Sequence, residues 1–113
     1  MFDTIKSVYE QYGRVIDPHT AVAAGVYQKY LNQTAEEIPT VIVSTASAFK
    51  FPASVLEAIT GKKAAEFEAV EALEKLGAAA PSSIKELSGR AVIHSGVCAK
   101  EEMPRIVLEF AAK

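Results

Sequence analysis

The chain has 113 residues, of which 50% are hydrophobic, and its 12 basic and 14 acidic side chains give a formal net charge of −2. Nucleic acids and anionic membranes require clustered Lys and Arg, so neither is expected as a partner. Cys98 is the single cysteine, which excludes an internal disulfide and a cysteine zinc site and favours a reducing cytoplasm. The sequence also shows no signal peptide and no run of about 20 apolar residues that a membrane span needs.

The first two expected elements are helices. Apolar residues recur at helical spacing over residues 5–12, and Gly13 is placed to end the first helix. Asp17 followed by Pro18 is typical of an N-cap and first helical position, which predicts a second helix to about Leu31. Its interior is small and apolar on all sides, so we expect it to be buried between layers or pressed against another backbone.

Two segments are expected to be strands. Thr40–Thr45 is short, continuous and rich in β-branched residues, which is typical of a strand that is covered on both faces. Ala91–His94 is a second, shorter candidate. A sheet needs about three or more strands to be stable by itself, and an unpaired apolar strand exposes backbone groups. Either the missing strands lie in a longer parent polypeptide, or the strand pairs with that of a second copy.

Helices are expected over the rest of the chain. One begins near Pro52 and ends at Gly61, one spans about Lys63–Leu76, and a short one spans about Pro81–Leu87. The last begins near Lys100 and is expected to bury three apolar side chains, namely Ile106, Val107 and Phe110. No linker divides the chain, so residues 1–113 are expected to form a single unit.

Five polar residues are candidates for a functional site. Asp17 is a helix cap or a catalytic acid, and His19 is either a surface residue or the rim of a ligand site at the helix start. Ser44 and Thr45 lie at the carboxyl end of the expected strand, where open α/β sheets bind ligands, although hydroxyl side chains also end strands. Lys50, between two phenylalanines, either binds a phosphate or extends into solvent. The usual nucleotide-binding, zinc-protease and hydrolase motifs are absent.

Two sequence elements, in this order, resemble the carboxyl-terminal part of threonine synthase. The first is IDPHTAVA at residues 16–23, and the second is VSTASAFKFP at residues 43–52. The resemblance is close over the first half of the chain, and after about Gly61 only the helical character agrees. It implies an α/β fold: a helix-rich fragment of a three-layer open-sheet pyridoxal-phosphate enzyme (fold type II) with one buried strand.

The resemblance also implies an activity. The family converts O-phospho-L-homoserine and water to L-threonine and phosphate with pyridoxal 5'-phosphate as cofactor. Its members are several times longer than this chain, and their cofactor-binding lysine and Gly-rich loop lie upstream of the matching region. The resemblance therefore implies a carboxyl-terminal fragment of a larger catalytic chain, which is inactive alone and has O-phosphohomoserine as a partner only in the complete enzyme.

One cofactor contact is implied at a matching position. In the family, the threonine of the STAS element places its hydroxyl beside the pyridine nitrogen of the cofactor, which here is Thr45. Residues 47–49 depart from the family, where a His-Pro pair often stands, and Asp17, His19 and Lys50 receive no definite role. The alternative is an independent α/β interaction module that completes its sheet by homodimerisation, and an artificial homodimer through an exposed sheet edge is also compatible with a fragment.

Overall fold

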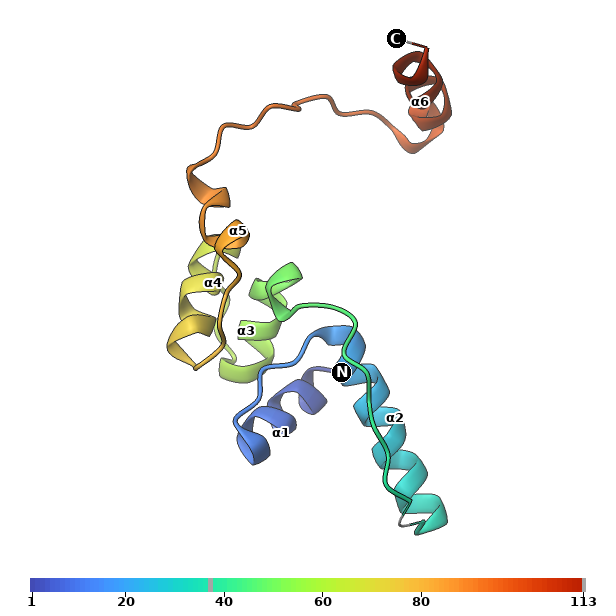
Figure 1. The fold of residues 1–113 in the computed structure, drawn as a ribbon, viewed down its shortest axis with the longest axis vertical. Coiled ribbons are helices and arrows are strands. Elements are labelled where there is room, and N and C mark those ends of the chain that lie inside the picture. Colours follow the sequence, from blue (N-terminus) through green and yellow to red (C-terminus); the bar gives the residue numbers. More distant parts are fainter. Residues whose placement is uncertain (37, 113) are drawn as a thin grey trace.

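The computed structural model describes residues 1–36 and 38–112, and these residues form helices joined by loops. The α-helices are α1 (Phe2–Tyr12), α2 (Pro18–Thr34), α3 (Pro52–Thr60), α4 (Glu66–Lys75), α5 (Ser82–Lys85) and α6 (Met103–Ala111). Three short 3₁₀ turns are η1 (Ala48–Lys50), η2 (Leu87–Gly89) and η3 (Lys100–Glu102). The molecule is elongated, with extents of 57 × 32 × 23 Å, and α6 stands apart from the other helices (Figure 1).

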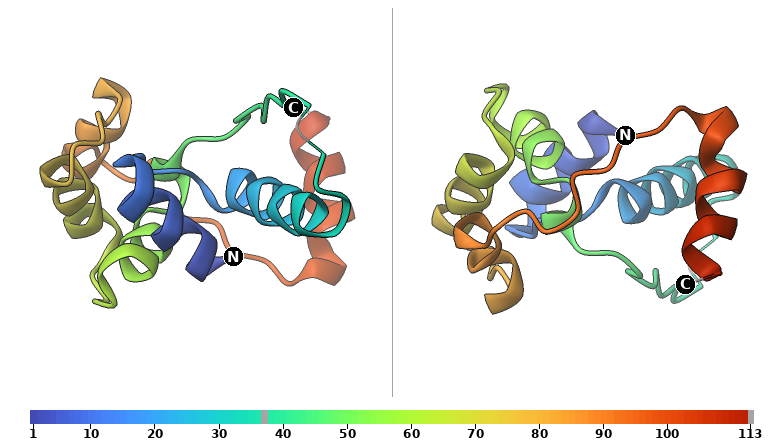
Figure 2. Two further views of the ribbon diagram at one scale, coloured as in Figure 1. Left: turned by 90° about the horizontal axis from the view of Figure 1, so that it is seen from below. Right: turned by 90° about the horizontal axis from the view of Figure 1, so that it is seen from above.

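The hydrophobic core lies where α1, α3 and α4 pack together (Figure 2). Ile5 of α1, Val55 of α3 and Leu73 of α4 are fully buried, and each lies on the apolar face that helical spacing predicts. Phe49 of η1 closes the same core. Helices were therefore placed correctly from the sequence in this region, although Phe67 of α4 is exposed despite its apolar side chain.

Helix α2 begins at the expected residue but is not buried on all sides. Asp17 caps it and Pro18 is its first residue, as predicted. Ala21 is buried, whereas Val22 and Val26 are exposed, so the expectation of burial between layers is wrong. A close approach exists at one point, Gly25, where an added Cβ would lie 3.1 Å from Oγ1 of Thr4 on α1.

The two expected strands are wrong for the part of the chain that the structure describes, and with them the open-sheet α/β fold of type II. Thr40–Thr45 is a loop in which Val41 is 87% and Val43 is 73% exposed. Ala91–His94 is likewise an exposed loop. β-Branched residues favour an extended backbone locally, but a strand also needs backbone hydrogen bonds to an adjacent strand. Among the described residues, these segments have no such partner. The described chain is helical.

The last helix also departs from the prediction. Ile106, Val107 and Phe110 were expected to be buried, yet all three are exposed, with Phe110 at 79%. Residues 91–99 carry α6 away from the core, so no part of the described chain covers its apolar face (Figure 1). None of the described helices combines the length and the apolarity that crossing a lipid bilayer requires.

Candidate functional site

A cluster of polar side chains joins the start of α2 to the loop that follows it. We call it the Asp17 cluster; it comprises Asp17, His19, Thr20 and Ser44. Asp17 has an extended backbone (φ −77°, ψ 162°), which turns its side chain back over the first turn of the helix. Its Oδ1 accepts hydrogen bonds from the backbone N–H groups of His19 at 2.8 Å and Thr20 at 3.3 Å. One carboxylate oxygen therefore caps the helix.

The other carboxylate oxygen faces two hydroxyl groups. Oδ2 of Asp17 accepts a hydrogen bond from Oγ1 of Thr20, and Oγ of Ser44 lies 3.3 Å from it. The two hydroxyl oxygens lie 2.9 Å apart. Oγ of Ser44 also lies 3.4 Å from the carbonyl oxygen of Ala46. Each hydroxyl has one proton to donate, so the two protons are shared among four contacts. This arrangement ties Ser44 to the first turn of α2.

Asp17 is 1% exposed, and its carboxyl group accepts hydrogen bonds. Burial by itself raises its pKa, but hydrogen bonds from the Thr20 hydroxyl, the two backbone N–H groups and the His19 ring together outweigh burial. The net pKa lies below its usual value of 3.8. Asp17 is therefore ionised at neutral pH, which favours the cap over the catalytic acid of the two roles that the sequence left open.

A cavity of about 410 Å³ adjoins the cluster. Its wall is formed by residues 13–17 before α2, by Ser44 and residues 46–49, and by the turn at residues 77–79. This volume is within the range of small-molecule sites. Asp17 and Ser44 line the cavity, whereas Thr45 is exposed and is not part of this lining.

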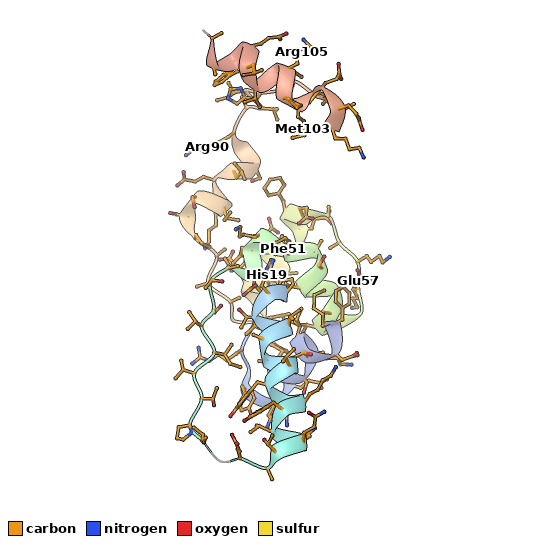
Figure 3. All side chains as sticks on the ribbon, turned by 90° about the vertical axis from the view of Figure 1, so that its right-hand side faces the viewer. His19, Phe51, Glu57, Arg90, Met103 and Arg105 are labelled. Atoms are coloured by element: carbon orange, nitrogen blue, oxygen red, sulfur yellow. The ribbon has the colours of Figure 1, made fainter. Side chains whose placement is uncertain are left out.

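The other candidate residues lie at different places. His19 is exposed, its Nδ1 is 3.3 Å from Oδ1 of Asp17, and its ring lies 5.4 Å from that of Phe51 between centroids (Figure 3). This position agrees with a surface residue in the first helical turn. Lys50 is exposed on η1 and does not line the cavity. Within residues 1–36 and 38–112, no three His, Cys, Asp or Glu side chains gather in a way that suits a metal ion.

Sequence reasoning missed the link between Asp17 and Ser44. The two residues are 27 positions apart, and no spacing rule connects a helix cap to a hydroxyl at that distance along the chain. The bonds that Ser44 makes to Asp17 and Thr20 span the largest sequence separation of the side-chain hydrogen bonds in the described residues. The available signal was weaker: a polar residue directly after an apolar run, in the same chain as an Asp-Pro cap.

The described residues do not by themselves form a site that fits pyridoxal phosphate. Thr45 is exposed and does not line the cavity beside the Asp17 cluster. The cavity lining includes Arg14 but no lysine, so covalent attachment of the cofactor is not provided at this cavity.

Comparison with known proteins places this helical chain with its capped α2 among domains of biosynthetic enzymes. The family model described as "Threonine synthase, C-terminal" matches residues 20–93, which extends well beyond the first half of the chain to which the close resemblance was confined. The chain belongs to the threonine synthase carboxyl-terminal family. No curated protein matches it.

Proposed function

We propose that this chain is the carboxyl-terminal part of a threonine synthase, which converts O-phospho-L-homoserine and water to L-threonine and phosphate. The observation that carries the proposal is the family match over residues 20–93, which contains the STAS element with Thr45. The same match supports pyridoxal 5'-phosphate as the cofactor of the complete enzyme. The chain forms one wall of the site.

Within that site, we assign the Thr45 hydroxyl to the pyridine nitrogen of the cofactor. Pyridoxal phosphate supplies an electron sink for the carbanions that form beside the amino group of the substrate. A hydroxyl donates a hydrogen bond to the ring nitrogen without requiring that the nitrogen be protonated, unlike a carboxylate. Thr45 would hold the pyridine nitrogen through a hydrogen bond and, unlike a carboxylate, would not keep that nitrogen protonated.

The chain alone is expected to be inactive, because the family resemblance places the lysine that binds the cofactor upstream of the matching region. A direct test mixes the purified chain with pyridoxal phosphate and records the absorption spectrum, followed by borohydride reduction. The expected result is the spectrum of the free aldehyde and no stoichiometric adduct. A reducible adduct at one lysine of this chain would contradict the proposal that the cofactor-binding lysine lies in another part of the enzyme.

The reaction itself is tested with a longer protein. The coding sequence that precedes the codon of Met1 is cloned together with this chain, and phosphate release from O-phosphohomoserine is measured. We expect release with the longer protein and none with residues 1–113. A longer protein that binds pyridoxal phosphate but releases no phosphate would contradict the proposed reaction.

The alternative function, an interaction module that completes its sheet by homodimerisation, is not favoured by any observation on the described residues. It depended on a strand at Thr40–Thr45, and this segment is an exposed loop. Without that strand, the described residues offer no sheet that a second copy could complete.

A further inference from the structure

Helix α6 carries an apolar face that no part of the described chain covers. Four apolar side chains recur at the spacing of one helical face, which we call the α6 stripe: Met103, Ile106, Val107 and Phe110. Their exposed fractions lie between 37% and 79%. Away from the stripe, Arg105 lies 2.6 Å from Glu109 and 3.5 Å from Glu102. Because these charges pair with one another, the stripe can be buried without leaving them unpaired.

A second apolar surface is a groove of about 670 Å³ beside α1 and α2, which we call the α1–α2 groove. Six large apolar or aromatic side chains line it: Val8, Tyr12, Ile16, Tyr27, Leu31 and Ile42. Ala24 and Gly25 are also in the lining, and their small size lets another backbone approach closely. Among the described lining residues the charged ones are Asp3 and Lys29, so the groove has no net charge. Such a groove suits the apolar face of an amphipathic helix.

The α6 stripe and the α1–α2 groove lie at opposite ends of the long axis of the molecule (Figure 1). Residues 90–99 connect η2 to η3 and lead α6 away from the other helices. Ten residues span at most about 33 Å, whereas the molecule is 57 Å long. In this arrangement α6 does not reach the groove of its own chain. A second copy turned end to end places its groove beside α6.

We propose that α6 of a second copy occupies the α1–α2 groove, so that two copies exchange these helices about a two-fold axis. The exchange is closed, since each copy supplies one stripe and one groove. If each stripe side chain removes about 100 Å² from water, one contact buries about 800 Å² over both surfaces. Two contacts bury about 1,600 Å², which is the usual size of a stable interface. The dimer uses no strand and does not depend on the proposed reaction.

Sedimentation equilibrium of residues 1–113 measures the dimer and its Kd. Val107→Ser removes one stripe side chain and should raise Kd about a hundredfold, tenfold for each of the two contacts. Leu108→Ser is the matched control, because Leu108 is the next residue of α6, is 70% exposed and lies outside the stripe. It should change Kd by less than about twofold. A wild-type chain that stays monomeric at about 1 mM, or equal effects of the two variants, would overturn the proposal.

The groove is tested from its own side. Tyr12 lines the groove and is 64% exposed, so Tyr12→Ser should leave the chain folded and raise Kd at least about tenfold. Val22→Ser is its control, because Val22 is an exposed residue of α2 that is not part of the groove lining. A Tyr12→Ser dimer as tight as the wild type would place the contact elsewhere and contradict the proposal.

The native cysteine distinguishes exchange between copies from folding back within one chain. Cys98 is exposed and lies two residues before η3, so a nitroxide attached to it marks the position of α6. Nitroxide-labelled chains are mixed with unlabelled, isotope-enriched chains, and amide NMR signals are recorded for the enriched ones. We expect the signals of Val8 and Ala24 in the groove to broaden. Broadening that occurs only when both labels are in the same chain would show that α6 folds back, and would overturn the exchange.

Discussion

Replacing Asp17 with Ala perturbs the cluster at its centre, because this carboxylate accepts hydrogen bonds from both α2 and the Ser44 loop. Loss of an N-cap side chain costs about 1 kcal/mol. Removing the acceptor of the Thr20 and Ser44 hydroxyls adds about 1 kcal/mol. We therefore expect the free energy of unfolding to fall by about 2 kcal/mol, which lowers Tm by about 8 °C in a chain of this size.

The assay is urea and thermal unfolding of the chain followed by far-ultraviolet circular dichroism, with Asp3→Ala as the control. Asp3 is also acidic and in a first helical turn, but it is exposed and α1 has no side-chain cap hydrogen bond. Its removal should change stability by about 0.5 kcal/mol or less, through the helix dipole alone. Equal losses for the two variants would refute the reasoning.

The pH dependence gives a second check on the same variant. The pKa of Asp17 is lowered in the folded chain, since hydrogen bonds to the carboxylate outweigh the opposing effect of burial. A lowered folded pKa means that the stabilisation is present above the ordinary value of 3.8 and is lost as the pH falls through the folded value. The gap in stability between wild type and Asp17→Ala should therefore narrow in acid, and a gap that stays constant would count against an ionised cap.

Three further predictions concern the fold and use the same unfolding assays. Leu73→Ala should cost about 3 kcal/mol because Leu73 is fully buried, whereas Leu87→Ala, at a residue 50% exposed, should cost under about 1 kcal/mol; similar losses would contradict the assigned core. Gly61→Ala should cost about 1 kcal/mol because φ is +71° there, and Gly89→Ala, with no positive φ, is its control; a neutral Gly61→Ala would argue against the left-handed cap. In the monomeric chain, Phe110→Ser should change stability by no more than about 0.5 kcal/mol, and a large loss there would show that α6 is covered by its own chain.

Helix ends were predictable because their causes are local. The Asp17-Pro18 pair places a capping oxygen and a preset φ at adjacent positions, and α2 starts there. Gly61 adopts the left-handed conformation that other residues avoid, and α3 ends there. In both cases the decisive interaction lies within four residues along the chain, so the sequence contains it.

The strand prediction failed because pairing is not local. Thr40–Thr45 has the β-branched composition of a buried strand, but this composition indicates only that the residues favour an extended backbone. Whether a neighbour exists depends on the rest of the polypeptide, and the described residues supply none. The exposed face of α6 has the same origin, since helical periodicity shows which face is apolar and not what covers it.

The absence of a strand in the described segment changes how Ser44 must be interpreted. A hydroxyl at the end of a paired strand often bonds to its own backbone, which is why strand termination and a ligand site were equally compatible with the sequence. No strand pairing holds this loop in the described chain. The hydrogen bonds of Ser44 to Asp17 and Thr20 attach the loop to the start of α2 instead. The residue that the sequence places at the end of a strand thus joins the loop to the cap of α2.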